Sequence, residues 1–225
     1  TLMKKGLSKA LNKPFYFIGL GGASDSSYLQ GHSYTYEGAT PGLIINALQS
    51  TNVMDPILYF DELDKISDTP KGDEIYNLLC HITDSSQNTE FQDKYFPNIN
   101  IDLSKTLIIF SFNDKSKINP ILLDRLTIIE TNGFDTDEKI NITKKYLIPD
   151  ICLDYGLNMD NIDFSDDYIK YIIKNYTNEK GVRCLKKNLE NIFGNINLLD
   201  LLSENNKLNC LIKIKKQLNS KYIKY

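Results

Sequence analysis

The chain has no long apolar run. No stretch approaches the roughly 18 apolar residues that a membrane span needs, and no charged segment followed by an apolar one opens the sequence. We therefore expect a soluble globule without a membrane partner. Because residue 1 is Thr rather than Met, we expect the native N-terminus to lie upstream, and the location, cytoplasm or mitochondrial matrix, stays undetermined.

A strong excess of positive charge is also absent. The 26 Lys and Arg residues face 29 Asp and Glu residues, which gives a net charge of −3. Non-specific nucleic-acid binding depends on a strong positive field, so this balance argues against a nucleic-acid partner. The four cysteines are too widely spaced for a zinc cluster, and we expect reduced core thiols.

Arginine is scarce, since Arg125 and Arg183 are the only two in the chain. At nearly every position where any positively charged side chain would do, the chain has lysine. A planar guanidinium binds phosphate oxygens through two hydrogen bonds, which an ammonium group cannot do. Both arginines are therefore candidate phosphate ligands. The two histidines, His32 and His81, have no partner at metal or nucleophile spacing, and we expect structural roles for them.

Short apolar runs alternate with helical patterns over residues 1–133. We predict strands at 15–18, 57–60, 106–112 and 126–131, and helices at 2–11, 41–49 and 74–83. Nearly continuous apolar strands separated by helices are typical of a parallel sheet that is covered on both faces. This region is therefore predicted to be a doubly wound α/β domain.

The pattern becomes entirely helical after the Asn-Gly-Phe stretch at 132–134. We predict helices at 135–147, 150–155, 166–175 and 182–193, which would form a small helical domain over 134–205. The remaining residues, 206–225, make up a basic tail. A solvated helix or strand edge is favoured for this tail over a nucleic-acid contact.

Two acids, Asp61 and Glu62, follow the apolar run 57–60 directly. Open α/β sheets bind ligands at the carboxyl ends of their strands. One carboxylate there can anchor the magnesium that bridges nucleotide phosphates, and the other can polarise the attacking water. We assign Asp61 to the metal and Glu62 to the water, in a Walker B arrangement. The alternative is an ordinary turn or helix cap.

Three further residues are candidates for the same chemistry. Asn113 ends the third apolar run and could orient the water, although an Asn at a strand end is often turn chemistry. Arg125 could reach a neighbouring subunit's nucleotide, with a surface ion pair to Asp124 as the alternative. Arg183 opens a helix, where the dipole disfavours a cation, and could contact the γ-phosphate.

A glycine-rich phosphate loop is not found. The stretch Gly19-Leu20-Gly21-Gly22 lacks the third Gly or Ala of a dinucleotide fingerprint, because Ser24 stands in that position. No Gly-Lys-Ser/Thr sequence occurs in these residues either. A phosphate-binding ATPase without such a loop would ordinarily be rejected.

Several segments together resemble the Lon proteases over roughly residues 1–195. The opening TLMKKGLSKALNKPF is similar to the helix that follows the Lon Walker A motif. The resemblance continues through GLGGASDSSYLQGHSYTYEGATPGLI, LYFDELDKI, DSSQNTEFQDKYF, NPILLDRL and YTNEKGVRCLKKNLE. On this alignment Thr1 is the Walker A threonine, and the resemblance implies that it binds nucleotide and Mg²⁺.

The resemblance implies an AAA+ P-loop-type sheet followed by a helical lid. It also implies magnesium-dependent ATP hydrolysis, a hexamer of identical subunits, and threading of unfolded or misfolded protein. Tyr36 would lie in a central pore loop and grip the polypeptide; without the resemblance, the alternative is an ordinary loop tyrosine. Glu37 stands where the family usually has an aliphatic residue, which bears on grip and substrate preference.

The Ser-Lys peptidase dyad of Lon lies in a separate domain, and nothing in these residues matches it. We therefore expect residues 1–225 alone to cut no peptides. We also expect no ATP turnover from them, because the strand before Walker A would be missing from the sheet. The alternatives are a stand-alone AAA+ chaperone or nucleic-acid remodelling ATPase without a protease, or an inactive remnant.

Overall fold

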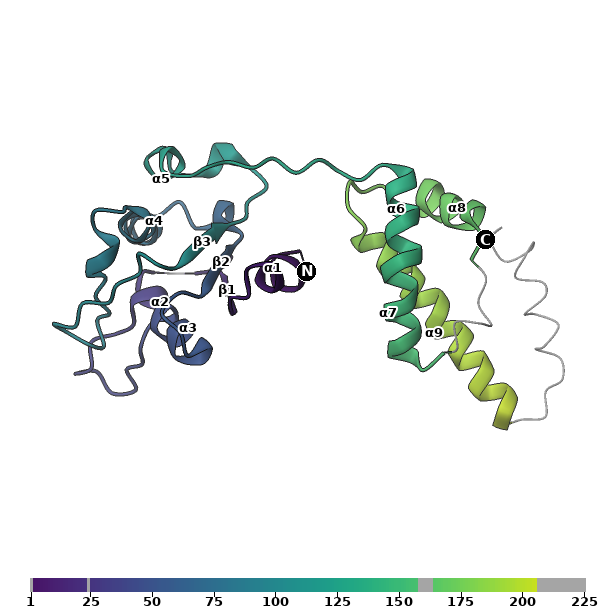
Figure 1. The fold of residues 1–225 in the computed structure, drawn as a ribbon, viewed down its shortest axis with the longest axis horizontal. Helices are drawn as coiled ribbons and strands as arrows, with labels where there is room; N and C mark the ends of the chain where they lie inside the picture. Colours follow the sequence, from purple (N-terminus) through teal and green to yellow (C-terminus); the bar gives the residue numbers. More distant parts are fainter. Residues whose placement is uncertain (1, 24, 158–163, 206–225) are drawn as a thin grey trace. The chain divides into compact units, whose positions relative to one another are not determined.

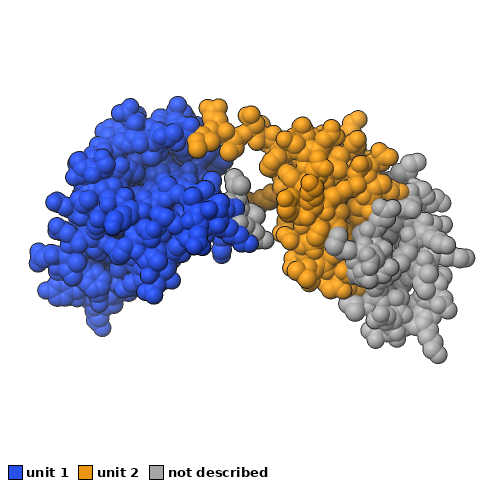
Figure 2. Space-filling view, in the orientation of Figure 1, with its two compact units in different colours: residues 1–128 blue, residues 129–225 orange. Residues whose placement is uncertain are grey.

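The computed structural model describes residues 2–23, 25–157 and 164–205, which fall into two compact units, Thr1–Ile128 and Ile129–Tyr225 (Figure 2). The described elements of the first unit are, in order, η1 (Leu2–Leu7), α1 (Ser8–Leu11), β1 (Phe15–Gly19), α2 (Ser27–Gln30), α3 (Leu43–Thr51), β2 (Ile57–Asp61), η2 (Leu63–Lys65), α4 (Pro70–Thr83), η3 (Asn88–Glu90), β3 (Leu107–Phe110), η4 (Lys115–Lys117) and α5 (Pro120–Asp124). Those of the second unit are α6 (Thr136–Ile142), η5 (Thr143–Leu147), α7 (Ile148–Tyr155), α8 (Asp166–Tyr176) and α9 (Arg183–Asn205) (Figure 1).

The sheet of the first unit is parallel, with the strand order β1-β2-β3. The chain crosses from β1 to β2 through α2 and α3, and from β2 to β3 through α4 (Figure 1). Parallel neighbours require such crossovers. As a result, all three strands end at the same edge, where Gly19 lies opposite Asp61 and Phe60 lies opposite Phe110.

One face of the sheet carries the main core. Ile18, Leu58 and Phe60 point to this face and are at most 1% exposed, in one cluster with the apolar residues of α3 and α4. Each such buried side chain contributes about 1.5–3 kcal/mol. On the other face, the ring of Tyr59 lies 5.6 Å from that of Phe15 and 6.0 Å from that of Phe17, which is 55% exposed.

The predicted strand at 126–131 was wrong. These residues form no strand, and the boundary between the two units falls among them, with Ile129 83% exposed. An extended segment becomes a strand only where a neighbour accepts its backbone hydrogen bonds, and in the described part of the chain no strand pairs with it. The apolar run alone could not show whether such a neighbour existed.

The second unit is helical, as predicted. A capping box between Asp135 and Glu138 starts α6. The core contains Leu185 and Leu189 of α9, both fully buried, and Phe193, whose ring stacks on Phe164 at 5.3 Å.

The sheet followed by a helical unit confirms the predicted fold class. No described helix combines the length and apolar character of a membrane span. The predicted tail, 206–225, lies outside the described residues.

Candidate functional site at the carboxyl end of strand β2

Asp61, the last residue of β2, is held by two hydroxyl groups. Tyr59 donates its hydroxyl to Oδ1 of Asp61 at 3.3 Å, and Ser111 donates its own to the same oxygen. Among the described residues no donor is directed at Oδ2. The half-buried carboxylate is thereby oriented through one oxygen, while the other stays available to a ligand.

This arrangement fits magnesium. Mg²⁺ prefers oxygen ligands and is usually held by one or two carboxylates together with substrate phosphates and water, rather than by a protein cage. Within the described ranges no cluster of three or more His, Cys, Asp or Glu side chains is suited to a metal ion. A site with a single carboxylate is sufficient for Mg²⁺, and Asp61 could supply it, because one of its oxygens is fixed and the other has no donor among the described residues.

Glu62 has an unusual backbone conformation. Its φ of 61° and ψ of 45° lie in the left-handed region, where non-glycine residues are uncommon and often functional. The conformation is fixed from both sides, because Leu63 donates its N–H to the carbonyl of Ser111 at 3.0 Å and Leu20 donates to the carbonyl of Asp61 at 2.9 Å. The chain therefore turns sharply between the two acids.

The exposed side chain of Glu62 lies against the loop that follows β1. A methyl group at Gly21 would overlap Oε2 of Glu62, so the carboxylate occupies the space that a side chain at position 21 would fill. The loop that was rejected as a dinucleotide fingerprint thus makes room for a predicted catalytic group. This role of Gly21 was not foreseen from the sequence.

Asn113 lies beyond the same edge of the sheet. Strand β3 ends at Phe110, and two residues separate Asn113 from this end. The side chain of Asn113 is exposed. Of the residues that follow β3, Ser111 is the one that contacts Asp61, and sequence reasoning missed it. The register supplies the reason, because Phe60 pairs with Phe110 and the next residues in the two strands become neighbours.

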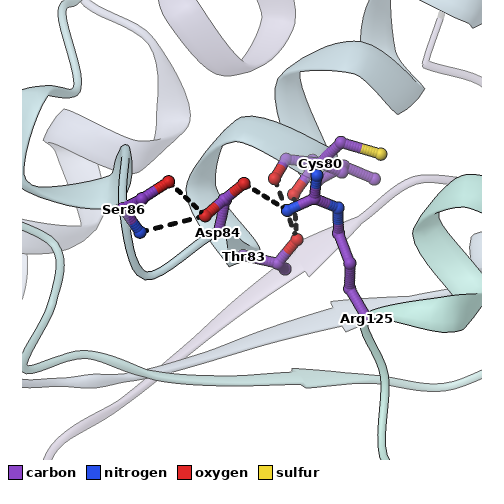
Figure 3. A network of polar contacts seen from close by, with 6 residues as sticks. Cys80, Thr83, Asp84, Ser86 and Arg125 are labelled. Carbon is purple, nitrogen blue, oxygen red and sulfur yellow. Dashed lines mark hydrogen bonds and ion pairs between the residues drawn. The ribbon is translucent and has the colours of Figure 1, made fainter.

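Arg125, at the end of α5, forms an ion pair within its own chain. Its Nη1 lies 2.5 Å from Oδ2 of Asp84, the residue that follows α4 (Figure 3). The partner is therefore Asp84 and not Asp124, the alternative considered from the sequence. Oδ1 of Asp84 accepts the hydroxyl of Ser86 at 2.7 Å and its N–H at 2.9 Å.

These contacts fix the charge state of the pair. The hydroxyl of Ser86, followed by the Arg125 guanidinium, holds the pKa of Asp84 well below its usual range. Asp84 in turn raises the pKa of Arg125. The guanidinium thus has a defined position on the surface of the first unit, which an isolated arginine would not have.

Arg183 belongs to the second unit and is the first residue of α9. Its side chain is exposed, and no hydrogen bond or ion pair holds it among the described residues. Glu179 accepts the N–H of Leu185 at 2.9 Å and so places a negative charge at the helix N-terminus. This carboxylate explains how a cation is tolerated there. Thr1 lies outside the described residues.

Tyr36 and Glu37 lie in an exposed loop between α2 and α3. Tyr36 is 70% exposed, and Glu37 is also exposed. Gly38 has a φ of 76°, which supports a tight turn, and the N–H of Ala39 donates to the carbonyl of Tyr36 at 3.1 Å. The backbone of the loop tip is ordered by these bonds, while the aromatic ring projects from it.

Two family models match the chain. Residues 1–133 match the model of the ATPase family associated with various cellular activities (AAA). Residues 154–205 match the Lon protease AAA+ ATPase lid domain. The first match includes the whole α/β unit, and the second includes α8 and α9.

Known relatives show the same similarity. The chain is 44% identical over 199 residues to a Lon protease homolog of Acanthamoeba polyphaga mimivirus, a match that covers 88% of the chain and 20% of that protein. It is 40% identical over 193 residues to a mitochondrial Lon protease homolog of Yarrowia lipolytica (86% and 16%) and 42% identical over 192 residues to the Lon protease of Mycoplasmopsis agalactiae (85% and 19%). The chain thus spans a fifth or less of the length of these three relatives.

Proposed function

Because the chain belongs to the AAA family of ATPases and its residues 154–205 match the lid domain of Lon protease ATPases, we propose that it hydrolyses ATP to unfold and thread polypeptides for a Lon-like protease. One observation carries the chemical part of this proposal. At the end of β2, Asp61 is oriented through a single oxygen and Glu62 is turned into the left-handed region beside Gly21. A turn alone would account for the backbone of Glu62, but it would not need two hydroxyl groups on one oxygen of Asp61.

Each acid then has its own task. Asp61 would ligate Mg²⁺ through Oδ2. Thr1, which the alignment with Lon assigns to the same metal and to the nucleotide, would supply its hydroxyl as a second ligand. A Mg²⁺ ion held there would supply the positive charge that offsets the negative charge developing during phosphoryl transfer. Glu62 polarises the attacking water and accepts its proton, and Asn113 orients that water through its amide.

The two arginines have complementary tasks in this proposal. Arg125 reaches the nucleotide of an adjacent subunit as an arginine finger, and Asp84 presents its guanidinium at the surface. Arg183 contacts the γ-phosphate bound by its own chain and reports whether ATP or ADP is present. Its side chain is exposed and has no hydrogen-bond or ion-pair partner among the described residues, which agrees with a group that needs a phosphate partner.

Polypeptide binding is assigned to the loop between α2 and α3. The exposed ring of Tyr36 would contact unfolded or misfolded protein, and Glu37 would modulate the preference for particular segments. We propose a hexamer of identical subunits, which the similarity to Lon proteases implies, and in which Arg125 and Tyr36 would both act between chains. The mitochondrial and bacterial relatives agree with a mitochondrial matrix or cytoplasmic location.

Residues 1–225 alone are expected to lack both peptidase activity and ATP turnover. No Gly-Lys-Ser/Thr phosphate loop occurs in them. A stand-alone chaperone, a nucleic-acid remodeller and an inactive remnant are the alternatives. The match of residues 154–205 to the lid domain of Lon proteases does not favour them.

The substitution Glu62→Gln in the complete protein tests the proposal. The amide keeps the size of the side chain but cannot accept a proton, so ATP hydrolysis should fall by at least about a hundredfold while ATP affinity stays within about twofold. Hydrolysis is measured by phosphate release and affinity by calorimetry. Glu90→Gln, which changes an exposed glutamate of η3, is the control and should retain parental turnover. Equal turnover in Glu62→Gln and parent would remove Glu62 from this role.

A further inference from the structure

The loop that carries Tyr36 closes on itself at two glycines, Gly31 and Gly42. Gly31 has a φ of 72°, and a methyl group on its Cα would lie 2.8 Å from the backbone nitrogen of Gly42. A methyl group at Gly42 would overlap the carbonyl of Leu29. The two ends of loop 31–42 are therefore in contact and leave no room for a side chain.

Asp93 lies at this closure, although it is 51 residues beyond Gly42 in the chain. Asp93 is buried, with only 1% of its surface exposed. Oδ2 accepts the N–H of Gly42 at 2.9 Å, and Oδ1 accepts the N–H of Tyr95 at 2.8 Å. Oδ1 also faces Gly31, since a methyl group there would lie 2.7 Å away.

A carboxylate buried in this way depends on its donors. Burial raises the pKa of Asp93, and the N–H groups of Tyr95 and Gly42 act in the opposite direction. An ionised group removed from water is tolerated only where hydrogen bonds replace its hydration. Both oxygens of Asp93 are therefore committed to holding the two segments together.

Asp93 also completes the N-terminus of α3. Gly42 is the N-cap of this helix and has no side chain that could accept a hydrogen bond from its first turn. The negative charge of Asp93 beside this end of the helix is electrostatically favourable. Helix α3 buries Ile44, Ile45, Ala47 and Leu48 in the core, so one end of the loop is fixed to a rigid element.

The segment 91–101 is itself anchored in the core. Phe91 is fully buried and pairs with Ile101 in an antiparallel bridge. A second link joins this segment to α2, because Lys94 donates its N–H to the carbonyl of Gln30 at 2.8 Å. The contacts of Asp93 and Lys94 thus meet both sides of the loop base.

We propose that Asp93 is a positioning residue for polypeptide threading: its carboxylate locks the base of loop 31–42 to segment 91–101. The base then moves with the α/β core, while the ring of Tyr36 remains free at the tip. This inference rests on the proposed role of Tyr36 in gripping polypeptide. Without the lock, the loop would yield when the chain is pulled, and ATP would be spent without movement of the polypeptide.

The test uses Asp93→Asn in the complete protein, with fluorescein-labelled casein as the unfolded polypeptide. The amide nitrogen cannot accept a hydrogen bond, so either Gly42 or Tyr95 loses its acceptor. Casein degradation should fall by about tenfold more than ATP hydrolysis, so that ATP consumed per casein rises by that factor. Asp102→Asn is the matched control, because Asp102 accepts the N–H of Ser104 at 2.8 Å in the same local geometry but is exposed.

Hydrogen exchange gives a second, local readout. Asp93→Asn should raise amide exchange in 31–42 and 91–101 together, and Asp102→Asn should not. Unchanged exchange, or equal losses of casein degradation and ATP hydrolysis, would overturn the lock. Raised exchange with parental casein degradation would also overturn its proposed importance for threading. If Asp93→Asn does not assemble, Asp93→Glu serves instead, since its extra methylene displaces both oxygens while keeping the charge.

The proposed function can fail separately from this inference. If Tyr36→Ala degrades casein at the parental rate, the grip assigned to the loop is wrong, whatever Asp93 does. If Glu62→Gln hydrolyses ATP normally, the catalytic assignment is wrong, while the exchange result for Asp93 still stands. The three variants therefore report on three different claims.

Discussion

The end of β2 and loop 31–42 belong to the same α/β unit but hold their functional side chains in opposite ways. Asp61 is half-buried, and two hydroxyl groups fix one of its oxygens. Tyr36 is 70% exposed, and the hydrogen bonds at its position join backbone atoms and leave the ring unconstrained. The first region orders the reacting groups, and the second orders only the base of a loop.

The difference reflects what each task requires. Phosphoryl transfer depends on alignment of the reacting groups, and a displacement of about 1 Å can cost a hundredfold in rate. A grip on polypeptides of varied sequence needs a ring that adapts to each side chain it meets. At the end of β2, the carboxylate of Asp61 itself must therefore be held in place. In loop 31–42, only the base has to be held, through the contact of Gly31, Gly42 and Asp93.

The largest effect is expected for Arg125. It tests whether a side chain that forms an ion pair within its own chain can act on the nucleotide of a neighbouring subunit. Arg125 is paired with Asp84, yet we propose that it serves a neighbouring nucleotide. Rings made only of Arg125→Lys subunits should lose about a hundredfold or more in turnover. Mixing these subunits with Glu62→Gln subunits should restore phosphate release, because some interfaces then combine an intact Glu62 with an intact Arg125.

Arg183 provides the matched control for this mixing experiment. We propose that it acts on the nucleotide of its own chain, so Arg183→Lys and Glu62→Gln subunits can never combine into an intact site. Their mixture should stay inactive. Absence of recovery with Arg125→Lys, or recovery with Arg183→Lys, would contradict the division of tasks between the two arginines.

A smaller effect is expected when the hold on Asp61 is weakened. Ser111→Ala removes one of the two hydroxyl donors, and the Mg²⁺ concentration that gives half-maximal ATP hydrolysis should rise by about tenfold. Ser116→Ala is the control, since Ser116 donates its hydroxyl to Asp114 at 2.6 Å in an exposed turn away from the predicted metal ligand. Parental magnesium dependence in Ser111→Ala would show that orientation of Asp61 does not matter.

The smallest effect is expected at the loop tip, where a single exposed ring is removed. Tyr36→Ala should reduce casein degradation by about fivefold, because an aromatic contact contributes only about 1 kcal/mol. Tyr34→Ala is the control, since Tyr34 is 62% exposed in the same loop. Degradation rates are followed by fluorescence at saturating ATP. Equal losses in the two variants would assign the grip to the loop as a whole and not to Tyr36.

The strands that carry the site could be located from the sequence because they are continuous apolar runs. The predicted strand 57–60 was confirmed and continues to Asp61, and the predicted run 106–112 contains β3. The same rule failed at 126–131, where no strand of the described residues pairs with the apolar run. Apolar character indicates that a segment prefers burial, but a strand also needs a hydrogen-bonding neighbour.

The contacts that orient the site residues could not be predicted in the same way. Ser111 reaches Asp61 because β2 and β3 pair in one register, and a shift by one residue would replace it. Asp84 reaches Arg125 across 41 residues of chain. Such pairs depend on how α4, α5 and the strands pack, and no local pattern encodes that packing.

Residue types and short-range order determined which groups in this protein can carry chemistry: two adjacent acids after an apolar run, two arginines in a chain that otherwise uses lysine, and an aromatic residue near a loop glycine. These signals are local, so the sequence alone was sufficient for them. Tertiary structure decided which oxygen of Asp61 is held, which acid pairs with Arg125, and that Asp93 closes the loop of Tyr36. Those contacts join segments far apart in the chain, and only the packed core brings them within hydrogen-bonding distance.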